Sequence, residues 1–269
     1  MKVKKTSANC FLSKKIGYAF LFAFYLVLNS GNAQSIDSLA DTIEKIKPSV
    51  VGVGTFMPKR SPRALFLGTG FVVGGGNLVV TNAHVIPETL DAQHLEEVAV
   101  FYRKGKDEKI VTAKQIAVDK EHDLAILQLS EGQLPPFKLG NASAVREGQL
   151  YAFTGYPMGM MLGLYPVTHR GIISSITPTI IPLISAGQLN EKLMKRLQAP
   201  YLVFQLDATA YPGNSGSPLY NTDSGEVVGV INKVFIQEGK ENAISKPSGI
   251  TYAIPINHLE NLLHEIKLH

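Results

Sequence analysis

Residues 211–219 read YPGNSGSPL, which sets Ser215 between Gly213 and Gly216. Glycines on both sides of a serine let the chain make a tight turn that directs backbone N–H groups to one point. A nucleophilic serine needs such donors, and it also needs a base that takes its proton. Taken alone, the stretch could equally be a tight turn without any chemical role, so the rest of the chain has to decide.

Two upstream segments supply the missing groups. TNAHV (residues 81–85) follows the apolar run 78–80, and EHDLAIL (residues 121–127) places Asp123 at the start of an apolar strand. Alone, His84 could be a structural histidine and Asp123 a turn residue. Together they give the order His, Asp, Ser, which occurs on double β-barrels. The rival GxSxG hydrolase pattern fails because Ser217 stands where its last glycine should be.

The spacing of apolar residues independently predicts an all-β fold. Short β-branched runs between residues 50 and 231 are separated by Gly, Pro and Asn, which is typical of a barrel or sandwich. Helical spacing occurs at both ends, over residues 35–47 and 255–267. A third, shorter helix is expected over residues 188–197, inside what looks like an inserted loop.

The amino terminus predicts a secretory signal peptide over residues 1–33. Five lysines without an acid precede an apolar run from Ile16 to Leu28, and Gly31 and Ala33 stand at the positions where cleavage needs small residues. The alternative is a retained membrane anchor. The run is shorter than the roughly 20 residues of a spanning helix, so we expect cleavage before Gln34, a periplasmic or secreted location and no stable membrane span afterwards.

Removing this segment changes what the composition implies. The full chain of 269 residues has 26 Lys and Arg, 22 Asp and Glu, and one cysteine, Cys10. Five of the basic residues and no acid lie in residues 1–33, which leaves 21 against 22 and a net charge of −1. Without the signal peptide, the charge of the chain no longer argues for binding to nucleic acid, and we expect none. The mature chain has no cysteine for a disulfide, zinc or iron–sulfur site.

On these motifs the sequence resembles the trypsin-like serine proteases, and within them the HtrA/Deg branch. The matching stretches run through nearly the whole mature chain and include GTGFVV (68–73), VTNAHVI (80–86), HDLAIL (122–127), GNSGSPL (213–219) and GEVVGVIN (225–232). The resemblance implies two packed six-stranded Greek-key β-barrels, over about residues 48–137 and 138–256, with a C-terminal helix over about 256–267. The family usually carries PDZ domains after the protease domain, and we expect none here.

The resemblance also implies roles for individual residues. His84 would be the general base, Asp123 the acid that orients it and Ser215 the nucleophile, with the N–H groups of Gly213 and Ser215 as the oxyanion hole. The substrate pocket would include Thr209, Asn232, Lys233, Val234 and Ile250. With no acid at Thr209 and a branched side chain at Ile250, we expect small or β-branched apolar residues at the cleavage position. Residues 232–234 would offer a backbone edge to an extended peptide.

These features predict a serine endopeptidase that acts on polypeptides without a metal or organic cofactor. His122 beside Asp123 invites a metal interpretation, but adjacent strand residues point to opposite faces. Further histidines are expected at the surface, namely His94, His169, His258, His264 and His269. The alternative function is a latent or non-catalytic peptide-binding, chaperone-like module on the same fold. The apolar stripe over residues 36–46 could form a homotrimer contact, or it could dock on its own barrel.

Overall fold

The computed structural model describes residues 38–157, 163–179, 200–232 and 249–268. Contacts between residues separate 1–38 from 39–269, and the fold below belongs to the second unit. The predicted signal peptide, the expected helix at 188–197, and Lys233, Val234 and His269 lie outside the described residues. No helix among the residues described is both long and apolar enough to span a bilayer.

Six antiparallel strands close the first barrel. Around the barrel the order is β1-β2-β3-β6-β5-β4, and β4 pairs back onto β1. The strands are β1 (Val50–Phe56), β2 (Ala64–Val73), β3 (Leu78–Asn82), β4 (Glu97–Lys104), β5 (Asp107–Asp119) and β6 (Leu124–Leu129).

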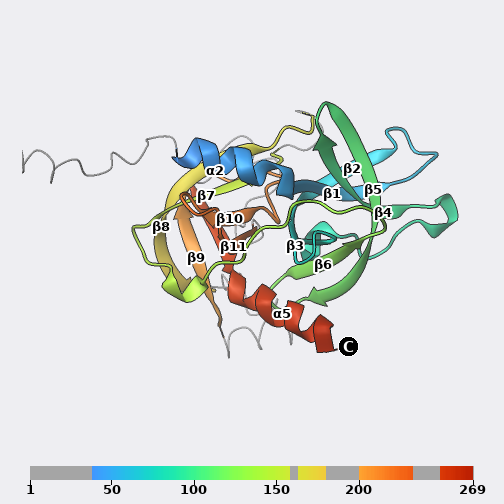
Figure 1. Ribbon diagram of the computed structural model, residues 1–269. Coiled ribbons are helices and arrows are strands. Elements are labelled where there is room, and N and C mark those ends of the chain that lie inside the picture. The colour runs from blue at the N-terminus through green and yellow to red at the C-terminus, as the bar shows by residue number, and fades with distance from the viewer. Residues whose placement is uncertain (1–37, 158–162, 180–199, 233–248, 269) are drawn as a thin grey trace, which may run out of the picture. The chain divides into compact units, whose positions relative to one another are not determined.

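The second barrel repeats this topology. Its order is β10-β11-β12-β9-β8-β7, which equals the order of the first barrel when β7–β12 are counted from one to six. The strands are β7 (Leu150–Gly155), β8 (Val167–Pro178), β9 (Leu202–Asp207), β10 (Pro218–Asn221), β11 (Val227–Asn232) and β12 (Ile250–Pro255). The predicted all-β fold of two six-stranded barrels is confirmed (Figure 1).

Strand alternation explains why many strands are apolar on both faces. In β1, Val51 and Val53 belong to a core made of first-barrel residues alone, whereas Val50 belongs to a core shared by both barrels. This shared core also contains Phe71 of β2 and Tyr220 of β10. Successive side chains on a strand point to opposite faces, so one face fills the barrel and the other joins the two barrels.

The two α-helices in the described part of the chain close this shared core. Ile46 of α2 (Ser38–Ile46) is buried in it, and Thr42 Oγ1 donates to the carbonyl of Asp223 at 3.3 Å, so α2 docks on its own second barrel. In α5 (Ile256–Leu268), Ile256 and Leu259 are fully buried. Figure 1 shows α5 leaving the second barrel and running back to the first, where it contacts β5.

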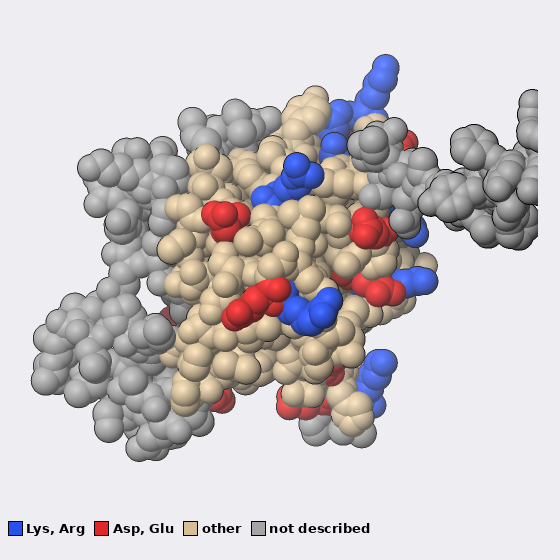
Figure 2. Space-filling model, turned by 90° about the vertical axis from the view of Figure 1, so that its left-hand side faces the viewer, with Lys and Arg blue, Asp and Glu red and all other residues tan. Residues whose placement is uncertain are grey.

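Charges on the face drawn in Figure 2 are mixed. Acidic and basic side chains are interspersed there, and neither kind gathers into a single large patch. This arrangement agrees with the nearly balanced charge of the chain after residue 33.

Candidate functional site

His84 lies in a short 3-10 turn, Ala83–Val85, directly after β3. Its imidazole Nδ1 is 2.6 Å from Asp123 Oδ2, and its backbone N–H donates to Asp123 Oδ1 at 2.9 Å. The backbone carbonyl of Asp123 in turn accepts from the N–H of Ala83 and from the side-chain amide of Asn82, both at 3.1 Å. A carboxylate can only accept, so Nδ1 carries the proton in the neutral ring and Nε2 is left as the basic nitrogen.

Asp123 is held from both barrels. Its φ of 56° is one of two positive values among the described non-glycine residues, and such backbone conformations often mark functional positions. Asn232, the last residue of β11 in the second barrel, donates its side-chain amide to Asp123 Oδ2 at 2.8 Å. The carboxylate therefore accepts three hydrogen bonds, two from His84 and one from Asn232, which fix its orientation.

Ser215 lies in a tight turn between Gly213 and Gly216, whose φ angles are 98° and 87°. The residue is 7% exposed. The N–H groups of Asn214, Gly216 and Ser217 donate to carbonyls within the turn or to Ile231. The N–H groups of Gly213 and Ser215 have no hydrogen-bond partner in the described part of the chain. They are thus two donors, two residues apart, that remain available to a ligand.

The serine turn lies beside the turn that carries His84. The N–H of Thr69 in β2 donates to the carbonyl of Ser215 at 2.9 Å. A Cβ added at Gly68 would lie 2.7 Å from Val85 Cγ2 and 3.1 Å from the Ser215 carbonyl, so both segments touch the same glycine. Within the described residues, the hydrogen-bond network runs from Asn232 through Asp123 to His84, and Ser215 Oγ is not part of it.

The residues predicted for the substrate pocket separate into two groups. Ile250 is 42% exposed and pairs with Asp207 across β12 and β9, and Thr251 Oγ1 donates to the Ala208 carbonyl at 2.6 Å. Ile250 thus lies opposite the end of β9, and Thr209 follows two residues after Asp207. The side chain of Asn232 is directed instead to Asp123, a contact that sequence reasoning missed. The two residues are 109 positions apart, and no spacing pattern links them.

A cavity of about 780 Å³ adjoins the His84–Asp123 pair. It lies against the turn after β3 and the end of β5. Its lining includes Ala83, His84, Ile86, Pro87, Glu88, Thr89, Gln115, Val118, Lys120 and Asp123. No local pattern marks Glu88, Gln115 or Lys120 as lining residues, because they come from two separate segments.

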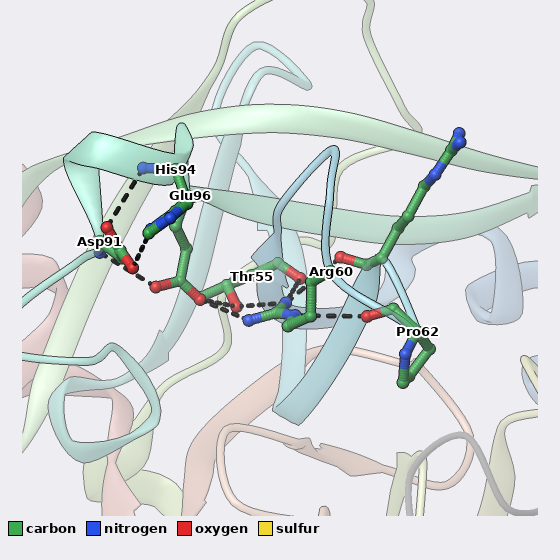
Figure 3. A network of polar contacts seen from close by, with 7 residues as sticks. Thr55, Arg60, Pro62, Asp91, His94 and Glu96 are labelled. Carbon is green, nitrogen blue, oxygen red and sulfur yellow. Dashed lines mark hydrogen bonds and ion pairs between the residues drawn. The ribbon is translucent and has the colours of Figure 1, made fainter.

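His–Asp pairing occurs twice more in the described residues. His122 Nδ1 lies 2.6 Å from Asp119 Oδ2, and His94 Nδ1 lies 2.7 Å from Asp91 Oδ2 (Figure 3). Among the residues described, no three or more His, Cys, Asp or Glu side chains are grouped as metal ligands would be. The expectation that His169 and His258 lie at the surface is wrong. Both rings are half-buried, and they stack on Phe153 and His122 with centroids 5.0 Å and 3.8 Å apart, respectively.

Comparison with known families decides the assignment. Residues 68–230 match the family described as "Trypsin-like peptidase domain". The chain belongs to the trypsin-like peptidases. The matched range contains His84, Asp123 and Ser215.

Within the trypsin-like peptidases, the similar proteins are of the HtrA and DegP type. The chain is 31% identical over 201 residues to "Probable periplasmic serine endoprotease DegP-like" of Halomonas elongata, covering 75% of this chain and 35% of the relative. It is 33% identical over 233 residues to "Serine protease HTRA2, mitochondrial" of Bos taurus (84% and 42%) and 29% identical over 235 residues to "Serine protease HTRA3" of Mus musculus (85% and 44%). The chain spans less than half the length of these relatives.

Proposed function

We propose that this trypsin-like peptidase is a serine endopeptidase in which Ser215, His84 and Asp123 form the catalytic triad. The observation that carries the proposal is the contact of 2.6 Å between His84 Nδ1 and Asp123 Oδ2. The Ser215 turn is hydrogen-bonded to β2, the strand that pairs with β3 before His84. This contact fixes the tautomer that leaves Nε2 free to accept a proton. The relatives are named serine proteases, which agrees with this role.

The reaction follows from these groups. Ser215 Oγ attacks the carbonyl carbon of a substrate peptide bond while its proton passes to His84 Nε2. The protonated imidazole then gives this proton to the leaving amine as the C–N bond breaks, which leaves an ester on Ser215. Water, deprotonated by the same nitrogen, attacks the ester carbonyl carbon. The bond to Ser215 Oγ then breaks as the imidazolium returns the proton to Oγ. Asp123 stabilises the imidazolium in both half-reactions and stays ionised.

The N–H groups of Gly213 and Ser215 would form the oxyanion hole. Negative charge develops on the carbonyl oxygen of the substrate as Oγ attacks, and preorganised donors stabilise it. Both N–H groups lack a partner among the described residues, whereas those of Asn214 and Gly216 are paired. The unpaired donors alternate along the turn, which is the arrangement that a bound oxyanion requires.

The substrate is proposed to be an extended polypeptide with a small or β-branched apolar residue at the cleavage position. Thr209 and Ile250 offer no carboxylate to a Lys or Arg side chain, and the edge at residues 232–234 would pair with the peptide. We place the protein in the periplasm or outside the cell, on the basis of residues 1–33 and of relatives named periplasmic. Cleavage products carrying mainly Lys or Arg at the cut position would refute this pocket assignment.

Reaction with a fluorophosphonate tests the nucleophile. The wild-type protein should be labelled and Ser215→Ala should not, while Ser224→Ala, at an exposed serine in the β10–β11 turn, should be labelled like the wild type. If neither the wild type nor Ser224→Ala reacts, even with an unfolded protein present as activator, the endopeptidase proposal fails. The chain would then be better described as a peptide-binding module.

A further inference from the structure

Thr69 connects the first barrel to the serine turn through both its backbone and its side chain. It lies in β2 and is fully buried. Its hydroxyl donates to the carbonyl of Gly213 at 2.7 Å, and its N–H donates to the carbonyl of Ser215 at 2.9 Å. Gly213 is 144 residues away in the sequence. One residue therefore anchors the two carbonyls that flank Asn214 in the turn.

The direction of the Thr69 hydroxyl is fixed by its second partner. The N–H of Tyr156 donates to Thr69 Oγ1 at 2.9 Å, and both residues are buried. A hydroxyl has one proton to give, and Tyr156 occupies the acceptor side. The proton of Thr69 is left for the Gly213 carbonyl. In addition, Thr81 Oγ1 donates to the Thr69 carbonyl at 2.7 Å, which holds the backbone of Thr69 itself.

This anchoring controls which way the N–H groups of the turn can point. The peptide between Gly213 and Asn214 is held at both ends, by Thr69 at its carbonyl and by Tyr211 at its N–H. Gly213, with φ of 98° and no Cβ, would otherwise offer little resistance to rotation. The N–H of Gly213 belongs to the preceding peptide and the N–H of Ser215 to the following one, so the anchored peptide lies between them. Both N–H groups stay unpaired among the described residues.

Other polar side chains close to this point make no such contact. A Cβ added at Gly155 would overlap Ser217 Oγ and would lie 2.9 Å from Thr69 Oγ1 and 3.0 Å from Asn214 Oδ1. Within the described residues, the buried side-chain oxygens of Ser217 and Asn214 have no hydrogen-bond partner. Of the three side chains gathered behind the turn, Thr69 is thus the one that hydrogen-bonds its backbone.

We infer that Thr69 is a positioning residue for the oxyanion hole, acting through the Gly213 carbonyl that its hydroxyl holds. The inference rests on the proposed serine endopeptidase function. It deepens that function by assigning part of the transition-state stabilisation to a hydroxyl in the opposite barrel. Because Thr69 does not reach the substrate, its loss should lower kcat and leave KM nearly unchanged.

The test compares Thr69→Val, which keeps the shape and removes the hydroxyl, with Thr69→Ser, which keeps the hydroxyl. Thr69→Val should lower kcat by about 10- to 100-fold, less than the roughly 10²- to 10³-fold loss of a direct oxyanion donor. Its KM should stay within about twofold of the wild-type value, and Thr69→Ser should recover most of kcat. Thr69→Ala gives a second hydroxyl-free variant should Thr69→Val not fold.

Thr55→Val is the matched control. Thr55 is also fully buried in the first barrel, and its hydroxyl likewise makes two side-chain hydrogen bonds, to Glu96 at 2.7 Å and from Arg60 at 3.0 Å (Figure 3). The Thr55→Val variant should lose thermal stability but keep the kcat of the wild type. Suppose that the wild type hydrolyses peptide substrate and Thr69→Val keeps its kcat, or loses no more kcat than Thr55→Val does. This result would overturn the inference about Thr69 and leave the endopeptidase proposal standing. A wild-type protein that neither turns over nor reacts with the fluorophosphonate overturns both proposals.

Discussion

Two His–Asp pairs in this molecule have nearly the same local geometry and quite different surroundings. In each, the imidazole Nδ1 lies 2.6 Å from one carboxylate oxygen, and the backbone N–H of the same histidine donates to the other, at 2.9 Å for His84 and 3.0 Å for His122. His122 and Asp119 are three residues apart, and a single turn forms their contact. His84 and Asp123 are 39 residues apart, and their contact depends on the pairing of β3 with β6, in which Asn82 lies opposite Leu124.

The difference lies in what the other chain segments add. The ring of His122 stacks on His258 of α5 and meets the edge of Tyr201, with centroids 3.8 Å and 4.6 Å away. The ring of His84 borders a cavity, and Asn232 of the second barrel adds a third hydrogen bond to its carboxylate. A His–Asp contact is thus a common local motif. The neighbouring serine turn and the free side of the ring distinguish the candidate active site.

The largest difference between the two pairs is expected in the activity of the variants that lack His84 or His122. His84→Ala should lower kcat/KM by at least about 10⁴-fold, because it removes the proposed general base. His122→Ala should stay within about tenfold of the wild type, since its ring is packed between other rings and has no proposed contact with substrate. Peptide hydrolysis by the purified variants, with far-ultraviolet circular dichroism to confirm folding, measures both. Equal losses from the two substitutions would refute the assignment of His84.

Removing the third hydrogen bond to Asp123 should have a smaller effect. Asn232→Ala should lower kcat by about 10-fold with little change in KM, because the carboxylate keeps His84 but loses one constraint on its orientation. Asn221→Ala is the control, as Asn221 lies in the same barrel and its side chain only accepts from the N–H groups of Asp223 and Ser224. An Asn232→Ala enzyme with unchanged kcat would show that the pair needs no support from the second barrel.

The fold and the three proposed catalytic residues could be predicted because each depends on a short stretch of sequence. Strand periodicity and turn residues are local, and His84 and Ser215 lie in distinctive segments. The two six-stranded barrels are implied by the family resemblance that those segments carry, and the structure confirms them.

The supporting contacts could not be predicted, for a physical reason. The partner of Asn232 is 109 residues away and that of the Thr69 hydroxyl is 144 residues away, so only the closed barrels bring them together. A buried threonine in a β-strand looks like an ordinary strand residue. The half-buried position of His258 could not be predicted either, because helical spacing does not show which rings from other segments cover a residue at the edge of the apolar face.

His258, which stacks on His122 of the second pair, should make the stability of the protein depend on pH. Burial, and then the proximity of His122, lower the pKa of His258 to about 4. Below its ordinary value of 6.5, the unfolded chain takes up a proton at His258 that the folded chain does not, so stability falls as the pH drops from about 6.5 toward 4. The other charged or titratable side chains around this region are Asp119, Lys120, Glu121, His122, Tyr201 and Glu265.

His258→Phe keeps the ring contacts and removes the titration. Between pH 7 and pH 5 the wild type should lose about 1 kcal/mol more unfolding free energy than His258→Phe, a value reduced for solvent screening of this half-buried ring. Asp119 does not titrate in this window. Burial raises the pKa of Asp119, but the hydrogen bonds from His122 have the larger combined effect and lower that pKa below its ordinary value. Urea titrations at both pH values measure the difference, and parallel pH profiles for the two proteins would contradict this role of His258.

The smallest effect is expected at the third pair, His94 and Asp91. The side chains of His94 and Asp91 are 60% and 44% exposed, so water competes for the contact on every side. His94→Ala should leave peptide hydrolysis and the thermal midpoint unchanged within error. The neighbouring Glu96 supports this expectation, because it binds the backbone N–H of Asp91 and the side chains of Thr55 and Arg60, and none of these groups is removed (Figure 3). A clear loss of activity would mean that the pairing itself matters wherever it occurs, and the distinction between the pairs would have to rest on something other than burial and the serine turn.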